Sequence, residues 1–269
     1  MNEISNKKLF IDVQAIAIDL DGVVYTGNKV VPGIPEAIKK MRKTFKSIYF
    51  VTNNSGKRRQ TIKEKLISLN IPADEKEIIS SAYATAVFLK SISSSVSSFT
   101  AFVIGSDELK WELRETGIKV VEDCNINKID FLVVGFDQEF SYKKICIALD
   151  VLSGGAKFVA CNRDRTFPVE RGVMPACGPI VASVESAWGR KPDYEVGKPN
   201  TFFLEMITRE TKLAASQILV VGDTMESDIA MAINFGSPSV LISGSLIGMN
   251  NGLFPDLRIS SLADLPDLM

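Results

Sequence analysis

Short apolar runs alternate with stretches of helical periodicity along most of the chain. Runs such as Ala15–Ile18, Ser47–Val51 and Ile218–Val221 have the length and composition of strands that are buried on both faces of a parallel sheet. Between such runs, apolar residues recur at helical spacing, for example over Gly33–Phe45. Strands that alternate with helices predict an α/β fold with parallel sheets.

The alternation occurs in two parts of the chain. After about residue 81 a new series of strands and helices begins, and the first pattern resumes after Arg190 with Tyr194–Val196. We therefore expect a second parallel α/β layer over 81–189, between two segments, 1–80 and 190–269, that belong together. Helices are expected over 78–92 and 228–235.

Composition and charge exclude several classes of function. The chain has 269 residues, of which 46% are hydrophobic and 23% charged, as in a globular protein with a substantial core. The chain has 31 Lys and Arg residues and 32 Asp and Glu residues. It therefore has no excess of positive charge that would attract nucleic acid or an anionic membrane. No apolar run approaches the roughly 18 residues that span a bilayer, and no signal-peptide core is present. We expect a cytoplasmic protein.

Histidine is absent, and the cysteines are far apart. The absence of histidine excludes Ser-His and Cys-His nucleophilic pairs and His-ligated metals. Because Cys124, Cys146, Cys161 and Cys177 form no CxxC pair, we expect small core residues in a reducing compartment. Acid–base chemistry must then use carboxylates, Lys, Tyr or Cys.

Two carboxylates, Asp19 and Asp21, follow the first apolar strand, and Gly22 comes next. The carboxyl ends of strands are where open α/β sheets bind their ligands. Like charges so close repel unless a cation lies between them, and oxygen ligands suit a hard cation such as Mg²⁺. An ordinary acidic turn after a strand is the alternative interpretation.

Three other strand ends carry polar residues. Thr52-Asn53-Asn54-Ser55 offers donors for an anion, although N-capping of the next helix would also explain it. Lys198 lies between Gly197 and Pro199, and a solvated surface lysine is its alternative interpretation. Asp223 and Asp228 follow the strand that ends near Val221, and the helix dipole alone would explain Asp228 but not Asp223.

The four strand ends together predict one site. Strand ends of a parallel sheet meet at one edge, so the carboxylates, the amide and hydroxyl donors and the lysine are expected to converge there. Carboxylates for a divalent cation, with donors and a cation for an anion, describe a phosphoryl-transfer site.

The motifs also resemble those of a known family. Asp19-Leu20-Asp21-Gly22-Val23, Thr52-Asn53-Asn54-Ser55, Gly197-Lys198-Pro199 and Gly222-Asp223 through Asp228 look like the four motifs of the haloacid dehalogenase-like phosphatases. The chain is most similar to the NagD-like subgroup, which includes p-nitrophenyl phosphatases and phosphoglycolate phosphatases. The resemblance implies a Rossmann-like core with a large α/β cap inserted between the second and third motifs. The last motif often reads GDxxxTD, and Ser227 stands here in place of the threonine.

The resemblance also implies the role of each residue. Asp19 would attack phosphorus to form an aspartyl-phosphate, and Asp21 would protonate the leaving oxygen and then activate water. The ligands of Mg²⁺ would be Asp19, the Asp21 backbone carbonyl, Asp223 and Asp228. The phosphate oxygens would be held by Thr52, Asn53 and Lys198. The substrate would be a small phosphorylated metabolite, and the cap could carry a homo-oligomer interface.

Other activities share these motifs. A phosphotransferase or phosphomutase would differ only in the acceptor that replaces water. A dehalogenase is disfavoured, because it needs no carboxylate set of this size for Mg²⁺. A non-catalytic protein that binds a phosphorylated ligand would be expected to lack a catalytic residue, and none is missing.

A polar cluster in the inserted segment is the candidate for substrate selection. Asn162, Arg163, Asp164 and Arg165 follow an apolar strand, and the family's cap supplies a specificity loop from a comparable strand end. Arg suits carboxylates or phosphates, and Asn and Asp suit hydroxyls. We therefore expect these four residues to contact the non-phosphate end of an anionic substrate, although a solvated loop tip is the alternative.

Overall fold

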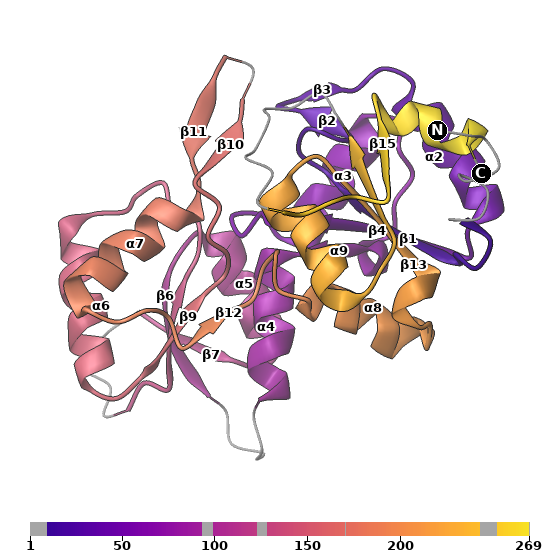
Figure 1. Cartoon of the computed structure of the whole chain (residues 1–269). Helices are drawn as coiled ribbons and strands as arrows, with labels where there is room; N and C mark the ends of the chain where they lie inside the picture. The colour runs from indigo at the N-terminus through magenta and orange to yellow at the C-terminus, as the bar shows by residue number, and fades with distance from the viewer. Residues whose placement is uncertain (1–9, 93–98, 123–127, 170, 243–251, 269) are drawn as a thin grey trace.

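The computed structural model describes residues 10–92, 99–122, 128–169, 171–242 and 252–268, which form two parallel sheets side by side (Figure 1). The first, named here the core sheet, has its described strands in the order β15 (Leu257–Ile259), β14 (Ser239–Ile242), β13 (Ile218–Gly222), β1 (Ala15–Asp19), β4 (Ser47–Thr52) and β5 (Ile78–Ser80). The second, the cap sheet, has the order β12 (Tyr194–Glu195), β9 (Lys157–Ala160), β8 (Phe131–Val134), β6 (Thr100–Ile104) and β7 (Lys119–Val121). The predicted α/β class with a Rossmann-like core and a cap is confirmed.

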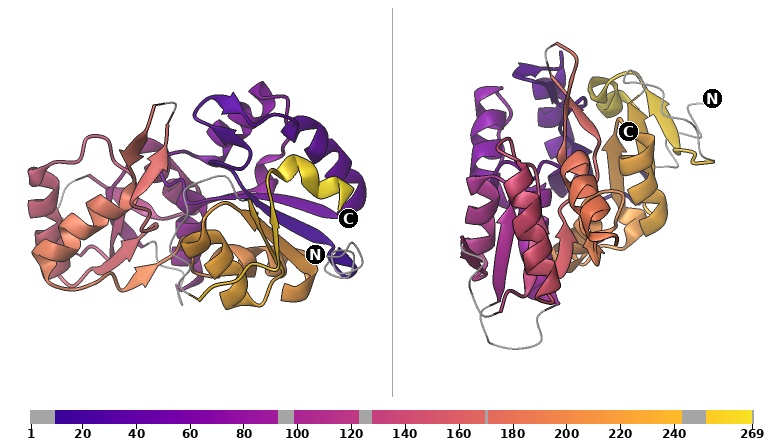
Figure 2. Two further views of the ribbon diagram at one scale, coloured as in Figure 1. Left: turned by 45° about the horizontal axis from the view of Figure 1, so that its top comes forward. Right: turned by 90° about the vertical axis from the view of Figure 1, so that its left-hand side faces the viewer.

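Helices cover both sheets (Figure 2). The α-helices are α2 (Ile34–Thr44), α3 (Arg59–Ser68), α4 (Ser81–Ser91), α5 (Asp107–Glu115), α6 (Tyr142–Ser153), α7 (Cys177–Trp188), α8 (Phe202–Thr211) and α9 (Ala230–Phe235). Shorter elements are η1 (Glu75–Glu77), η2 (Ala215–Gln217), η3 (Met225–Ile229) and η4 (Leu262–Asp267). None of the helices in the described ranges is long and apolar enough to cross a membrane.

Two small antiparallel hairpins lie outside the sheets. The first joins β2 (Tyr25–Thr26) to β3 (Lys29–Val30) directly after the first motif. The second joins β10 (Thr166–Pro168) to β11 (Val173–Pro175) and extends from the cap beside the core (Figure 1). Sequence periodicity predicts neither hairpin, because strands of two or three residues are too short to show an alternation.

The core sheet is buried on both faces. Ile16 and Ile18 point to the face that α2 and α3 cover, whereas Ala15 and Ala17 point to the opposite face. The apolar cluster on this second face continues through α4 and α8 into the apolar residues of the cap. One continuous apolar layer therefore joins the two sheets.

Several sequence predictions need correction. Ile78–Ser80 is not helical, because Ile78 and Ile79 pair with Phe50 and Val51 at the edge of the core sheet, and the helix begins only at Ser81. The predicted helix over 228–235 is divided into the π-helix η3 and the α-helix α9.

One strand beyond residue 189 pairs within the cap sheet. Strand β12 pairs in parallel with β9, so Tyr194 and Glu195 belong to the cap sheet, although the pattern places them with the core. The division of the chain at 81 and 189 stays a prediction.

Two of the cysteines are core residues, and one is not. Cys161 and Cys177 are buried, whereas Cys146 is exposed on α6, so the expectation of a core residue was wrong for Cys146. Cys124 lies outside the described residues.

Candidate active site

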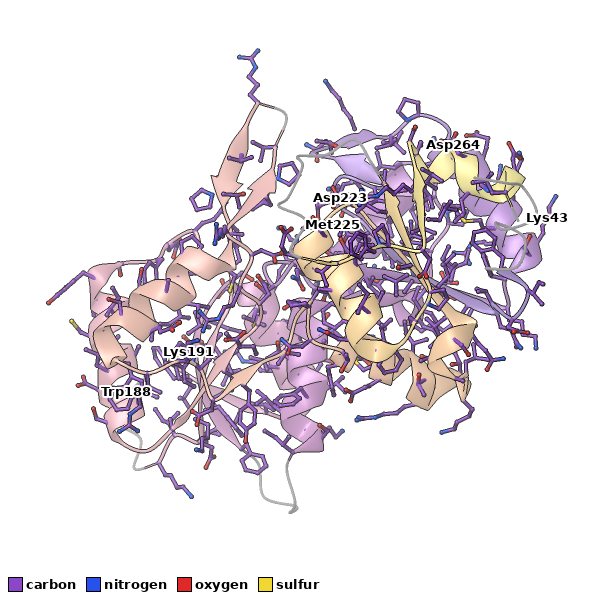
Figure 3. All side chains as sticks on the ribbon, viewed as in Figure 1. Lys43, Trp188, Lys191, Asp223, Met225 and Asp264 are labelled. Atoms are coloured by element: carbon purple, nitrogen blue, oxygen red, sulfur yellow. The ribbon has the colours of Figure 1, made fainter. Side chains whose placement is uncertain are left out.

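The ends of three neighbouring strands bring the motif residues together. Strand β1 lies between β4 and β13 and pairs with both in parallel, so the carboxyl ends of all three meet at one edge. Asp19 ends β1, Thr52 ends β4 and Asp223 follows β13 directly. Figure 3 shows Asp223 at the side of the core that faces the cap.

Lys198 lies between two of the aspartates. Its Nζ is 2.6 Å from Oδ1 of Asp19 and 2.6 Å from Oδ1 of Asp228, and all three side chains are buried. Asp228 also accepts a hydrogen bond from the backbone N–H of Thr224 at 3.1 Å, which fixes its position on η3. Carboxylate oxygens of Asp19, Asp223 and Asp228 lie within 4.8 Å of one another. The site therefore holds three carboxylates around one point, with one lysine to balance them.

Burial and charge oppose each other at these groups. Burial raises the pKa of Asp19, and the Lys198 charge opposes that rise. Burial alone would lower the pKa of Lys198, but the charges of Asp19 and Asp228 outweigh it and raise that pKa, so the lysine stays a cation. Burial also raises the pKa of Asp21, which favours the protonated form of this carboxyl group.

Two glycines leave the space that the carboxylates occupy. Gly22 has φ +90°, and a Cβ at this position would collide with the Asp223 carboxylate. A Cβ at Gly222 would collide with the side chain of Asp228. Because neither glycine can carry a side chain without displacing an aspartate, the motif glycines are needed for the carboxylate cluster itself.

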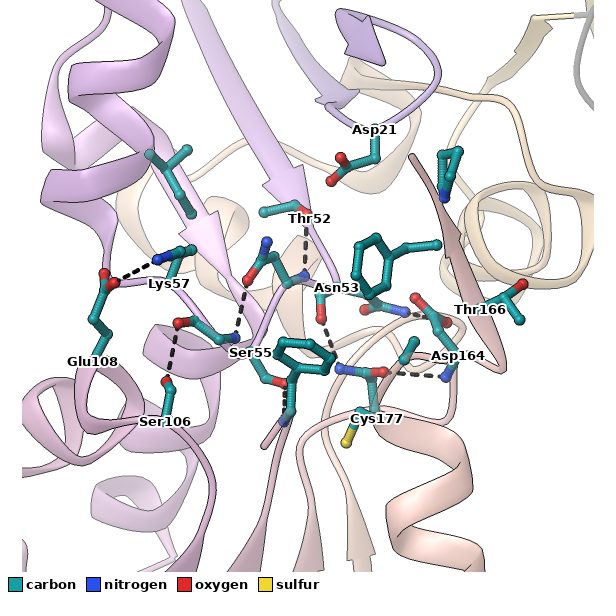
Figure 4. Close-up of a pocket in the computed structure, with 18 of the residues that line it drawn as sticks. Asp21, Thr52, Asn53, Ser55, Lys57, Ser106, Glu108, Asp164, Thr166 and Cys177 are labelled. Atoms are coloured by element: carbon teal, nitrogen blue, oxygen red, sulfur yellow. Dashed lines mark hydrogen bonds and ion pairs between the residues drawn. The ribbon is translucent and has the colours of Figure 1, made fainter. Parts of the chain in front are cut away.

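Asn53 links the core to the lysine loop and to the cap, and Figure 4 shows its side chain beside Asp164 of the cap. Its Oδ1 accepts a hydrogen bond from the Lys198 N–H at 2.8 Å, and its Nδ2 donates to the Lys198 carbonyl at 3.1 Å and to Oδ1 of Asp164 at 2.9 Å. Asn162 donates from Nδ2 to the Asn53 carbonyl at 2.6 Å. The Asn53 side chain therefore positions neighbouring residues.

The Thr52 side chain, unlike that of Asn53, keeps a hydrogen-bond donor for a ligand. Its Oγ1 accepts a hydrogen bond from the Asn54 N–H at 3.1 Å, which leaves the hydroxyl proton for a ligand.

A cavity of about 780 Å³ lies between the core and the cap and includes the carboxylate cluster. Of the four cap residues predicted to select the substrate, Asn162 and Asp164 line it. Arg163 does not line the described part of the cavity, because its guanidinium forms ion pairs with Glu185 and Glu195, both at 2.6 Å. Arg165 is exposed and also lies outside the lining of the described cavity. The structure thus brings two of the four residues to the site.

Other lining residues were not singled out from the sequence. Phe136 and Phe167 form an edge-to-face pair in the cavity wall, with ring centroids 5.6 Å apart. Lys65 of α3 lies over the ring of Tyr25, with Nζ 3.5 Å from its centroid. Burial lowers the pKa of Lys65, and the Asp21 charge partly restores it. In the sequence, Lys65 lies on the polar side of a predicted helix, where nothing distinguishes it from a solvated lysine.

Comparisons with known proteins agree with this geometry. Residues 16–119 match the model of the family described as haloacid dehalogenase-like hydrolase, and 195–246 match a second model described as HAD-hydrolase-like. The chain is 34% identical over 227 residues to an acid sugar phosphatase of Staphylococcus epidermidis, a match that covers 84% of this chain and 85% of the relative. It is 32% identical over 255 residues to the sugar-phosphatase AraL of Bacillus subtilis, with 94% and 92% covered.

Solved structures show the same relationship. A p-nitrophenyl phosphatase from Archaeoglobus fulgidus superposes with a TM-score of 0.86 at 31% identity, over 96% of this chain and all of that one. A 4-nitrophenylphosphatase from Thermotoga maritima gives a TM-score of 0.86 at 25% identity, over 99% of each chain. With its strand-end carboxylates, lysine loop and inserted cap, the chain belongs to the haloacid dehalogenase-like hydrolases and, among them, to the NagD-like phosphatases.

Proposed function

We propose that the protein is a Mg²⁺-dependent phosphatase that hydrolyses small phosphomonoesters through an aspartyl-phosphate on Asp19. The observation that carries the proposal is the buried cluster in which Lys198 pairs with Asp19 and Asp228 while Asp223 completes a set of three carboxylates. Such a cluster combines a nucleophile, a metal site and a cation for phosphate oxygens within one edge of the sheet.

The donor set fits a hard divalent cation. It consists of carboxylate oxygens within 4.8 Å of one another, and oxygen ligands are those that Mg²⁺ prefers. The side chains of Asp19, Asp223 and Asp228 and the backbone carbonyl of Asp21 would hold the ion. When bound, the ion would offset negative charge on the phosphoryl group and the carboxylates.

The residues of the chain divide the reaction between them. Asp19 attacks phosphorus, so that its Oδ–P bond forms as the ester P–O bond breaks, and Asp21 gives a proton to the leaving oxygen. Asp21 then takes a proton from the water that attacks the aspartyl-phosphate, which releases phosphate and restores Asp19. The Lys198 ammonium, the Thr52 hydroxyl and the Asn53 backbone N–H hold phosphate oxygens during transfer.

The substrate is proposed to be a small phosphorylated metabolite. Two relatives act on sugar phosphates by their names, and two structural neighbours are named for p-nitrophenyl phosphate. We propose that Asn162 and Asp164 of the cap, which line the cavity, contact the non-phosphate end of the substrate. We also propose a cytoplasmic location, and assembly of copies through the cap stays a prediction.

Release of inorganic phosphate tests the proposal. The purified protein is expected to hydrolyse p-nitrophenyl phosphate with Mg²⁺ and without any added acceptor, and to lose this activity in EDTA. Asp19→Asn is expected to keep the fold and to reduce turnover by several orders of magnitude, because the nucleophile is gone. Activity in EDTA, or wild-type turnover in Asp19→Asn, would overturn the proposed mechanism. Transfer to an alcohol in preference to water would indicate a phosphotransferase.

A further inference from the structure

The lysines that line the cavity differ in their partners. The cavity lining contains Lys57, Lys65, Lys110, Lys144 and Lys198. Four of these side chains form ion pairs: Lys57 with Glu108, Lys110 with Asp107 and Glu122, Lys144 with Asp137, and Lys198 with Asp19 and Asp228. Within the described ranges, Lys65 forms no ion pair, and its ammonium contacts the ring of Tyr25 instead.

The Lys65 ammonium is held in place by an aromatic ring. The ring of Tyr25 is buried, and Nζ of Lys65 lies 3.5 Å from its centroid, a distance at which cation and π-system attract each other. Tyr25 in turn is fixed to the first motif, because its carbonyl accepts a hydrogen bond from the Gly22 N–H at 2.8 Å. Lys65 is half-buried, and the Asp21 charge offsets only part of the cost of its burial. Since Lys65 forms no ion pair within the described ranges, its position beside the motif favours a ligand that brings a negative charge closer.

The position of Lys65 relates it to one part of the substrate. In the proposed reaction Asp21 gives its proton to the leaving oxygen, so the leaving group lies on the Asp21 side of phosphorus. Tyr25 pairs with Asp21 through an isolated bridge, which brings the Lys65 ammonium to that same side. The cap arginines cannot serve there, because Arg163 is engaged by two glutamates and lies outside the described cavity lining.

We propose that Lys65 binds a second anionic group, a carboxylate or its equivalent, on the leaving group of the substrate and thereby selects for anionic phosphomonoesters. The inference rests on the proposed function and moves the recognition of the anion from the cap loop to helix α3 of the core.

A matched pair of substrates tests this inference. The phosphate monoesters of 3-hydroxypropanoate and of 1,3-propanediol have the same chain length, but the first ends in a carboxylate and the second in a hydroxymethyl group. The reference substrate is p-nitrophenyl phosphate. The wild type is expected to prefer the carboxylate ester. Lys65→Met is expected to lower kcat/KM for that ester by roughly ten- to hundredfold, mainly through KM, because one charge-assisted hydrogen bond is lost. The diol ester and the reference are expected to change by less than about threefold, since neither carries a second charge.

Two further variants separate selection from general effects. Lys65→Arg keeps the charge and is expected to keep the preference, whereas Lys110→Met removes a paired lysine of the same cavity and is expected to leave it unchanged. Equal losses on all three substrates in Lys65→Met, or an unchanged preference, would overturn the inference while the proposed function stands. A wild type that hydrolyses none of the three esters would overturn the proposed function, and the inference with it.

Discussion

Gly22 leaves room for the Asp223 carboxylate, and a substitution can separate this role from its backbone conformation. Gly22 and Gly117 both have φ +90°, but only at Gly22 would a Cβ meet an aspartate, whereas nothing lies within 4 Å of a Cβ at Gly117. We expect Gly22→Ala and Gly117→Ala each to lose about 1–2 kcal/mol of stability from the left-handed backbone.

Only Gly22→Ala is expected to weaken Mg²⁺ activation and turnover as well, because the methyl group displaces Asp223 from the carboxylate cluster. Chemical denaturation measures the first effect, and a Mg²⁺ titration of phosphate release measures the second. Full activity in Gly22→Ala would show that the cluster tolerates a shift of Asp223.

The sequence predicts where a residue lies in the fold better than it predicts which side chains that residue contacts. Asp19, Asp223 and Lys198 follow buried apolar runs, and the structure brings them together because parallel strands end at one edge. Asn53 and Arg163 carry equally strong local signals, yet their side chains bind residues far away in the chain. No local pattern records that Arg163 faces two glutamates, so its predicted contact with substrate finds no support in the geometry.

At the scale of elements, buried strands are the most predictable feature. The interior positions of β1, β4 and β13 are apolar, because helices or cap residues cover both faces of these strands. The pattern over 78–92 predicts a single helix that includes β5, because three residues show no periodicity of their own and their pairing with β4 is a tertiary contact. The hairpin β10–β11 escaped prediction for the same reason.

The β10–β11 hairpin places an aromatic ring in the cavity wall. Phe167 on β10 meets Phe136 edge-to-face at 5.6 Å, whereas its cross-strand neighbour Met174 is exposed. We expect Phe167→Ala to raise KM for p-nitrophenyl phosphate by about two- to tenfold, because the aromatic wall is lost, while Met174→Ala changes little. Steady-state kinetics with p-nitrophenyl phosphate measure KM for both variants. Equal KM values for Phe167→Ala and Met174→Ala would mean that the aryl group binds elsewhere.

At the scale of the whole molecule, helix α5 of the cap is attached to the start of α3 in the core. Glu108 accepts hydrogen bonds from Lys57 Nζ at 2.8 Å, from the Arg58 N–H at 3.1 Å and from the Thr61 hydroxyl at 2.6 Å. Glu112 accepts one from the Arg59 N–H at 2.7 Å. These contacts hold the cap against the segment that follows the second motif.

The attachment has a pH dependence of known sign. Burial would raise the pKa of Glu108, but hydrogen bonds from Lys57 and Thr61 outweigh it and lower the pKa below its ordinary value of 4.5. The stabilisation is therefore present above about pH 4.5 and is lost as the pH falls through the lower folded-state value.

Glu108→Gln is accordingly expected to lower Tm most at neutral pH and to approach the wild type below about pH 4.5. Thermal unfolding over this pH range measures the difference. Glu115→Gln, on the exposed side of the same helix, is the control and is expected to show none of this convergence. A constant offset between wild type and Glu108→Gln at every pH would contradict the assignment.

The strand order of the core sheet also determines when the protein can fold on the ribosome. Strand β1 needs β13 as a neighbour, and the paired residues Ala15 and Ile218 are separated in sequence by most of the chain. At about 5–20 residues per second, roughly 10–40 s of translation separate the two strands, and during this time β1 lacks one of its partners. The strands β6, β7, β8 and β9 are complete well before β13 emerges. The cap strands can therefore pair first, whereas the edge of β1 that β13 later covers stays unpaired and prone to aggregation until β13 has emerged.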